Sequence, residues 1–287
     1  MQTTELLKKV RRIEIKTRRL SNHIFSGEYH SSFKGRGMSF SEIRRYEPGD
    51  DVRDIDWNVT AKLNEPYIKI FEEERELTLM LMVDISASGH FGTTVQNKRE
   101  TITEFCAVLA FSAMQNNDKV GVIFFSDQVE KFIPPKKGKS HVLRIIRELI
   151  EIKPVNKGTN ISEAIKFQIS VMKKQCISFL ISDFMDDDYL KNLQIAGRKY
   201  DLTGVRIYDR HEADIPNIGL VKMIDKESEE AVWVDTSSKK VRSHYLSWYN
   251  ENKAYFKDSF LKSGAGTIEL RTDESYVKKL MEFFKRR

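Results

Sequence analysis

The sequence predicts an α/β fold: a doubly wound, mostly parallel sheet with helices on both faces and an N-terminal appendage. From residue 77 onward, apolar runs of strand length alternate with segments of helical period, which is typical of a parallel sheet covered by helices. Of the 287 residues, 40% are hydrophobic and 10% are aromatic, which is enough to fill a sizeable core. We therefore expect residues 1–76 to form the appendage and residues 77–287 to form the α/β domain.

The first half of the α/β part contains three expected strands. Apolar runs predict strands over 77–84 and 120–126. The run 129–133 follows a short polar turn, so we expect it to pair antiparallel with 120–126. Pro134 and Pro135 lack the N–H that a ladder needs, so we expect the pairing to stop there.

Three helices are expected around these strands. Residues 99–114 carry apolar side chains at helical spacing, and the continuous apolar stretch around them indicates a largely buried helix. Ser140 can cap a second helix, whose end is marked by Pro154. Asn160 followed by Glu163 resembles a capping box at the start of a third helix.

The second half continues the alternation of strands and helices. We expect strands over 176–182, 202–208 and 266–270, two short strands within 220–234, and helices over 189–199, 240–261 and 275–284. Strand 176–182 is mostly apolar, as a strand buried on both faces should be.

The appendage is basic. Its first 36 residues contain nine Lys or Arg against three Glu, and so carry nearly all of the net charge of +6. Residues 6–20 have a helical pattern, and no low-complexity linker follows, so we expect this part to pack on the α/β domain. We expect the basic arm to dock on that domain or on an acidic partner. Nucleic acid is the weaker alternative, because no aromatic residues interleave with the basic run.

Composition also constrains the compartment. No stretch approaches the roughly 18 consecutive apolar residues of a membrane-spanning helix. The first twelve residues do not resemble a signal peptide, because Lys8 and Lys9 break the apolar stretch at once. We therefore expect a cytoplasmic protein without a transmembrane segment. Cys106 and Cys176 lie within apolar runs, where we expect buried free thiols and neither a disulfide nor a zinc site.

Oxygen-bearing side chains follow two of the expected strands. Residues 84–88 read D-I-S-A-S directly after the first strand, and Asp183 directly follows strand 176–182. Thr159 stands just before a helix. If the two strands are neighbours, these groups can meet at the carboxyl edge of the sheet, where α/β proteins bind ligands. The candidate metal ligands are Asp84, Ser86, Ser88, Thr159 and Asp183.

Hydroxyl and carboxylate oxygens favour a hard cation, so Mg²⁺ is the first expectation and Mn²⁺ the second. Three neutral hydroxyls leave most of the ion's charge unquenched, so that it can attract a carboxylate from a partner protein. Weak binding of this kind can leave the isolated protein without its metal. The alternative is that Asp84, Ser86 and Ser88 only shape a turn and cap the following helix.

This pattern, D-x-S-x-S with a later Thr and a later Asp, resembles the metal-ion-dependent adhesion site of von Willebrand factor A domains. Further segments resemble the signature of the DUF58 family. They are GRGMSF at 35–40, RRYEPGDDVRDIDW at 44–57, KIFEEER at 69–75, SDF at 182–184 and VDT at 234–236. The resemblance covers most of the chain and implies a Rossmann-like von Willebrand factor A fold.

The resemblance also implies a function. DUF58 proteins are bacterial or archaeal and are often encoded beside a MoxR-type AAA+ ATPase and other von Willebrand A-domain proteins. It implies a non-enzymatic, metal-dependent protein-interaction module, an adaptor or partner of such an ATPase in the assembly or maturation of client complexes. No small-molecule substrate is expected. Many members carry N-terminal transmembrane helices, which are expected to be missing here.

A second acidic cluster lies upstream of the first strand. It consists of Asp50, Asp51, Asp54 and Asp56. A two-metal hydrolase centre is one interpretation, but the nearby Arg44, Arg45 and Arg53 favour ion pairs, and the sequence PGDD favours a tight turn. We expect a structural network in which Arg53→Ala destabilises the fold.

A metal-dependent phosphohydrolase that uses Asp84 is an alternative function. Such an enzyme would carry a second acidic residue two positions later, where this sequence has Ser86. A Gly-rich phosphate loop is also missing. The three acidic residues 186–188 could add to the negative field around a metal, or lie at a helix N-terminus.

Overall fold

The computed structural model describes residues 11, 39–72, 77–86, 97–156, 158–224 and 231–286. The chain forms two compact units, one over 33–77 and the other containing the α/β domain from Thr78 onward. Of the expected helix over 6–20, only Arg11 is described, and it is helical. Packing of the basic arm on the α/β domain stays a prediction.

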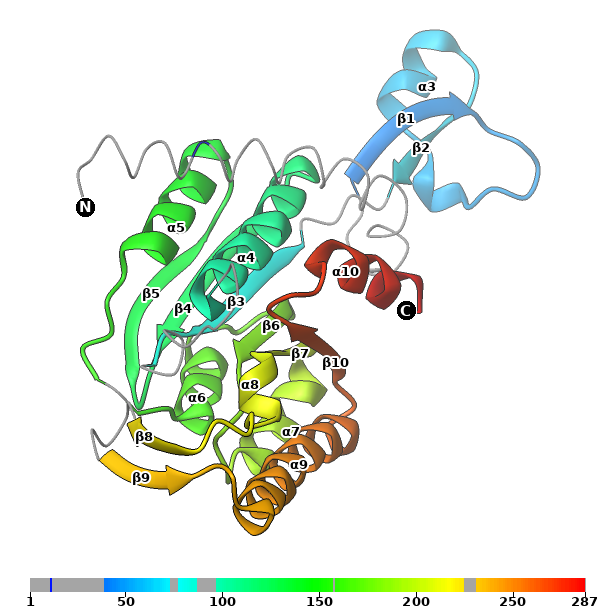
Figure 1. Ribbon diagram of the computed structural model, residues 1–287. Helices are drawn as coiled ribbons and strands as arrows, with labels where there is room; N and C mark the ends of the chain where they lie inside the picture. The colour runs from blue at the N-terminus through cyan, green and yellow to red at the C-terminus, as the bar shows by residue number, and fades with distance from the viewer. Residues whose placement is uncertain are drawn as a thin grey trace. The chain divides into compact units, whose positions relative to one another are not determined.

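A six-stranded sheet forms the centre of the α/β domain (Figure 1). Its strands, in chain order, are β3 (Thr78–Asp84), β4 (Lys119–Phe125), β5 (Val129–Lys136), β6 (Ile177–Ser182), β7 (Asp201–Tyr208) and β10 (Gly266–Arg271). The spatial order is β10-β7-β6-β3-β4-β5, and only β5 runs antiparallel to its neighbour. The predicted α/β class with a mostly parallel sheet is confirmed. The condition for a common site, that strands 77–84 and 176–182 be neighbours, is met, because β3 pairs with β6.

Helices cover both faces of this sheet. They are α4 (Lys98–Gln115), α5 (Lys139–Glu151), α6 (Ile161–Val171), α7 (Leu190–Lys199), α9 (Lys239–Lys262) and α10 (Tyr276–Lys285). On one face, α6, α7 and α9 pack on Met80, Met82 and Leu180. On the other, Phe105 of α4 and Phe283 of α10 both contact Phe179 of β6. The central strands are therefore buried on both sides, which explains why they are mostly apolar.

Local predictions were wrong in two places. β5 continues through Pro134 and Pro135 to Lys136, because an edge strand tolerates residues without an N–H. Ser140 does not cap α5: Gly138 holds the cap position with φ +101°, a conformation that favours glycine, and no side chain caps this helix. Asn160 does cap α6 by accepting the N–H of Glu163 at 2.9 Å.

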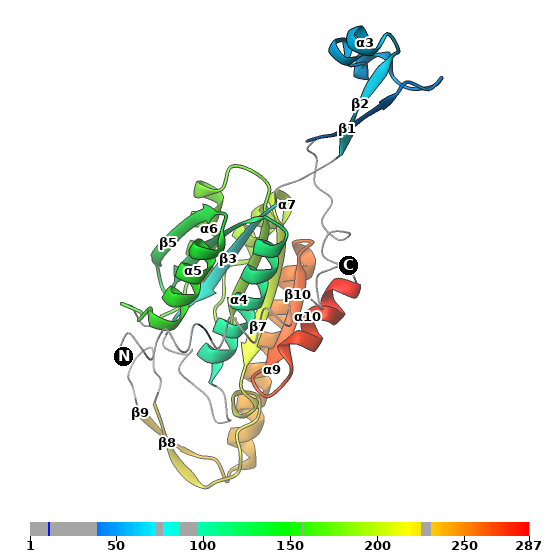
Figure 2. The same ribbon diagram turned by 90° about the horizontal axis from the view of Figure 1, so that it is seen from above.

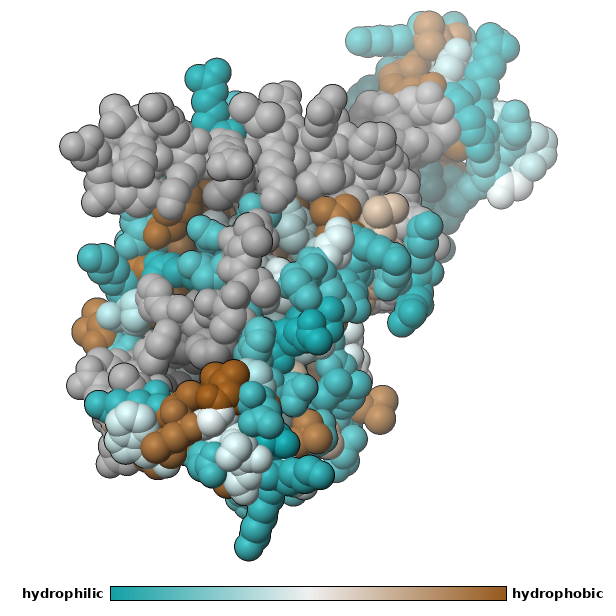
Figure 3. Space-filling view, viewed as in Figure 1, coloured by the Kyte–Doolittle hydropathy of each residue, from teal (hydrophilic) through white to brown (hydrophobic). Residues whose placement is uncertain are grey.

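The segment after β7 adds a small helix, α8 (Arg210–Ala213), and a separate antiparallel pair, β8 (Leu220–Ile224) and β9 (Ala231–Asp235). The two short strands were predicted and α8 was not. The β8–β9 hairpin stands away from the central sheet in both ribbon views (Figure 2). It exposes apolar side chains, among them Leu220, Val232 and Trp233. Brown, hydrophobic surface is visible over this hairpin in Figure 3.

The smaller unit is an antiparallel pair, β1 (Ser39–Arg45) and β2 (Tyr67–Glu72), with a 3-10 turn η1 (Val52–Asp54) and helix α3 (Trp57–Leu63) between the strands. None of these elements was predicted, because charged residues interrupt the apolar pattern of both strands.

The apolar segments contain buried cysteines and form helices of limited length or apolarity. Cys106 and Cys176 are free and buried, as predicted. Within the described part of the chain, the helices fall short of the length and apolarity that a membrane span requires.

Candidate functional site

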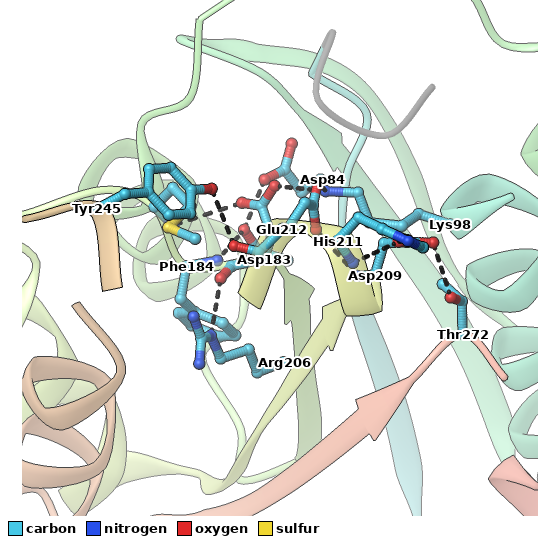
Figure 4. A network of polar contacts seen from close by, with 12 residues as sticks. Asp84, Lys98, Asp183, Phe184, Arg206, Asp209, His211, Glu212, Tyr245 and Thr272 are labelled. Carbon is cyan, nitrogen blue, oxygen red and sulfur yellow. Dashed lines mark hydrogen bonds and ion pairs between the residues drawn. The ribbon is translucent and has the colours of Figure 1, made fainter. Parts of the chain in front are cut away.

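Two carboxylates meet at the carboxyl edge of the central sheet. Asp84 is the last residue of β3 and Asp183 directly follows β6, the parallel neighbour of β3. Only 6% of Asp84 and 7% of Asp183 is exposed. With Ser86 they line one small cavity (Figure 4). The predicted meeting of these three residues is therefore seen in the structure.

Hydrogen bonds from Ser86 and Ser182 hold Asp84. Its Oδ1 accepts the backbone N–H of Ser86 at 2.9 Å and its Oδ2 accepts the Ser182 hydroxyl at 2.6 Å. Burial, followed by the negative charge of Asp183, raises the pKa of Asp84 to about 7. The charged form of Asp84 is therefore disfavoured at this position.

The loop that carries Asp183 is fixed from two sides. Phe184, which follows it, has φ +56° and a fully buried ring that packs on Phe256, with 4.4 Å between ring centroids. Its N–H donates to the Ser182 hydroxyl at 3.0 Å. The carbonyl oxygen of Asp183 accepts Nε of the buried Arg206 at 3.1 Å. A left-handed, bulky residue is rare and persists only where its surroundings hold it, so this loop has a set conformation.

A buried lysine completes the cluster. Lys98, the first residue of α4, is 2% exposed, and its Nζ lies 3.0 Å from Asp183 Oδ2 and 2.6 Å from Glu212 Oε1. Burial opposes its charge, but Asp183 and Glu212 outweigh that effect and raise the pKa of Lys98. Lys98 is therefore a buried cation that bridges two carboxylates.

Glu212 belongs to α8 and is itself held in place. Its side chain accepts the N–H of Asp209 at 2.9 Å, which closes a capping box, and its carbonyl oxygen accepts the Tyr245 hydroxyl at 2.8 Å. Burial raises the pKa of Glu212, although Lys98 opposes this.

The other two predicted ligands are less directly placed. Ser88 lies outside the described residues. Thr159 is half-buried and precedes α6, and the first N–H of that helix, from Ile161, donates to Asp186 Oδ2 at 2.7 Å. The segment with Thr159 therefore lies beside the loop with Asp183. The meeting of all five residues stays a prediction, and Asp186 lies at a helix N-terminus, as one interpretation of 186–188 expected.

Sequence reasoning missed three members of the cluster: Ser182, Lys98 and Glu212. A signal existed for Lys98, which stands in register with the buried Ile102 and Phe105 of α4 and so falls on an apolar stripe. The spacing of Asp209 and Glu212 matches a capping box after a strand. Ser182 stands in the segment SDF at 182–184, which resembles the family signature, but this pattern did not assign its hydroxyl to the site.

The donors at this site suit a hard divalent cation in type, since they are carboxylate and hydroxyl oxygens. Among the residues that the structure describes, no three His, Cys, Asp or Glu side chains form a metal cage. An ion here would depend on hydroxyls and water besides Asp84 and Asp183, as the adhesion-site pattern implies. Lys98 departs from this fit because it already neutralises part of the charge of Asp183.

The second acidic cluster has a different arrangement. Arg44 forms a double hydrogen bond with Asp50 at 2.8 and 2.7 Å, within a turn in which Gly49 has φ +116°. Asp51 caps η1 and Asp56 caps α3. These carboxylates serve as caps and ion-pair partners, which supports the structural interpretation.

The importance given to Arg53 is corrected. Its side chain is 91% exposed and lies 3.7 Å from Asp51, so it adds little to the network. Arg44 is the anchoring residue instead.

Comparisons with known proteins identify the family. Residues 42–255 match the family model described as "Protein of unknown function DUF58". The uncharacterized protein Rv1480 of Mycobacterium tuberculosis (strain ATCC 25618 / H37Rv) is 24% identical over 277 residues, which span 96% of this chain and 87% of that protein. The uncharacterized protein YeaD of Bacillus subtilis (strain 168) is 21% identical over 201 residues, 70% of this chain and 46% of YeaD.

Similar solved structures include the conserved hypothetical protein BatB from Bacteroides thetaiotaomicron, with 16% identity and a TM-score of 0.48 over 73% of this chain and 98% of BatB. A von Willebrand factor type A protein from Catenulispora acidiphila has 11% identity and a TM-score of 0.41, over 76% of this chain and 43% of that one.

Proposed function

The chain belongs to the DUF58 family, and we propose that it is a protein-interaction module whose binding depends on a divalent cation at the carboxyl edge of the sheet. One observation carries this proposal. Asp84 and Asp183 come from neighbouring parallel strands, are both buried, and line a single cavity with Ser86. Two carboxylates brought together in this way repel each other, and a bound cation would relieve that repulsion.

The proposed ligands are Asp84, Ser86 and Asp183, completed by Ser88 and Thr159. The ion, Mg²⁺ or Mn²⁺, would supply an electrophilic position for an acidic residue of the partner protein. The chain's own residues fix this position. Ser182 and the Ser86 N–H orient Asp84, while Arg206 holds the backbone of Asp183.

The proposed partner is a MoxR-type AAA+ ATPase, with other von Willebrand A-domain proteins as further candidates. This part of the proposal rests on the family resemblance, and it places the chain in the assembly or maturation of client complexes. Recognition of an acidic side chain fits the chemistry of the site, because a carboxylate is a strong ligand of a hard cation.

The experiment is a binding assay between the purified chain and a purified MoxR-type ATPase, with Mg²⁺ or with EDTA. We expect EDTA and Asp84→Ala each to abolish binding. Asp51→Ala is the matched control: it also removes one carboxylate, but from an exposed turn, and should bind normally. Binding that survives both EDTA and Asp84→Ala would refute the proposal, provided that thermal melting shows the variant to be folded.

A phosphohydrolase that uses Asp84 is the alternative of a different class. Turnover of a phosphate ester by the wild type, lost in Asp84→Asn, would establish it. Nucleic-acid binding by the basic arm would appear as retarded DNA or RNA in a low-salt gel shift.

A further inference from the structure

We infer that Lys98 is a resident cation of the candidate site, which competes with a divalent ion for Asp183 and so limits how tightly that ion binds. The inference rests on the proposed function and names a residue that sets the affinity of the proposed site for its ion. The ammonium of Lys98 lies 3.0 Å from Asp183 Oδ2, which is one of the oxygens proposed to bind the ion (Figure 4).

The position of Lys98 makes this competition unavoidable. Its side chain is 2% exposed, so water screens its charge little. A divalent ion bound to Asp183 would lie within a few ångströms of the ammonium and be repelled by it. The ion therefore binds with lower affinity next to the ammonium, or it binds when the ammonium moves away.

Glu212 offers the ammonium a place to move to. Lys98 Nζ lies 2.6 Å from Glu212 Oε1, closer than it lies to Asp183. Glu212 is fixed by its bond to the N–H of Asp209 and by the Tyr245 hydroxyl. Lys98 can therefore release Asp183 and keep one buried counter-ion, which avoids the high cost of a buried unpaired charge. Glu212 is thus a positioning residue, which acts on the site through Lys98.

The alternative is a purely structural ion pair that ties the start of α4 to the sheet. The two interpretations differ in what they predict for metal affinity. A structural pair has no influence on the metal once the fold is intact. A competing cation predicts that affinity rises when the lysine is removed, even when the total charge of the chain stays the same.

The test measures Mn²⁺ binding by isothermal titration and electron paramagnetic resonance, on the metal-stripped full chain. The main variant is Lys98→Met with Glu212→Gln, which removes one charge of each sign. We expect it to bind Mn²⁺ about tenfold or more tightly than the wild type, as expected when a neighbouring like charge is removed. Addition of Asp84→Ala should abolish this binding. Lys131→Met with Glu148→Gln removes a matched pair, 2.6 Å apart on α5 and β5, and should leave the affinity unchanged.

Glu212→Gln alone is a second, milder variant. With its other partner neutral, Lys98 should hold Asp183 more firmly, so Mn²⁺ affinity should fall below that of the wild type. Affinities that rise in the double variant and fall in this one support the inference, and thermal melting checks that each variant is folded.

The outcomes separate this inference from the proposed function. Equal or weaker Mn²⁺ binding by the folded double variant overturns the role of Lys98, while Asp84-dependent binding by the wild type would leave the proposed function standing. Binding by the double variant alone supports the inference in its strongest form. Absence of Mn²⁺ binding from wild type and double variant alike overturns both.

Discussion

The two acidic clusters of this chain contain similar residues in different surroundings. In the smaller unit, Asp50, Asp51 and Asp56 are used one by one, in an ion pair with Arg44 and as caps of η1 and α3. At the edge of the central sheet, Asp84 and Asp183 are buried together beside a single lysine. The first cluster is richer in carboxylates, but only the second concentrates their charge.

The difference teaches that the convergence of buried carboxylates, and not burial alone, decides what an acidic cluster can do, since Asp56 is only 8% exposed and yet serves as the cap of α3. An exposed carboxylate that caps a turn is satisfied by an N–H group and by water. A buried pair of carboxylates must find a cation or accept a proton. Each of the following experiments perturbs one of the two clusters.

The largest effect is expected from Lys98→Met. This change leaves Asp183 and Glu212 buried without their cation, which should cost about 3–5 kcal/mol in the free energy of unfolding. Urea denaturation of the metal-free protein measures it. Lys131→Met removes a more exposed lysine from an equally short ion pair and should cost no more than about 1 kcal/mol. Equal costs for the two variants would show that burial does not distinguish them.

Ser182→Ala should have the next largest effect. The Ser182 hydroxyl donates to Asp84 and accepts from Phe184, so its loss leaves two buried polar groups unsatisfied. We expect a loss of about 1–3 kcal/mol in the free energy of unfolding. Ser170→Ala, which removes an exposed hydroxyl bonded to the Phe167 carbonyl, is the control and should change stability far less. If Ser182→Ala left the free energy of unfolding unchanged, the hydrogen bond from Ser182 to Asp84 would not contribute to stability.

Most of the α/β domain could be predicted from the sequence, because buried parallel strands are mostly apolar and are separated by helical patterns. The adjacency of β3 and β6 made the meeting of Asp84 and Asp183 predictable as well. The β1–β2 pair escaped prediction because its strands mix apolar with charged residues.

The partners of the site residues were harder to predict. Lys98 forms an ion pair with Glu212, although Glu212 lies much later in the chain, in α8 after β7. No local pattern links two residues so far apart in sequence, and only the fold places them together. The same reason explains Ser182, whose role depends on the strand beside it.

In the second acidic cluster, Arg44→Ala should lower the stability of the smaller unit more than Arg53→Ala does. Arg44 makes a double hydrogen bond to Asp50, whereas the Arg53 side chain is 91% exposed. We expect a loss of about 1 kcal/mol for Arg44→Ala and less than about 0.5 kcal/mol for Arg53→Ala. Amide hydrogen exchange along β2 reads out this unit alone. A larger effect for Arg53 would restore the interpretation that the sequence favoured.

The smallest expected effect is a change in the pKa of Asp50. The hydrogen bond from Arg44 lowers the pKa of Asp50 below its usual 3.8. The stability that this pair contributes is therefore present above pH 3.8 and lost as the pH falls through the lower pKa of the folded state. Carboxyl-carbon NMR titration should find the pKa of Asp50 depressed in the wild type and higher in Arg44→Ala, although the N–H of Glu47 still holds it below 3.8. An unchanged pKa in the variant would remove Arg44 as the cause.

The most direct test of the account locates a bound ion. Mn²⁺ is titrated into isotope-labelled, metal-stripped protein, and the paramagnetic broadening of backbone amide signals is followed by NMR. We expect that the amides of Ser86 and Phe184 broaden first and that Asp84→Ala removes the broadening. Broadening centred on Arg53 and Asn58, or unchanged by Asp84→Ala, would contradict this expectation.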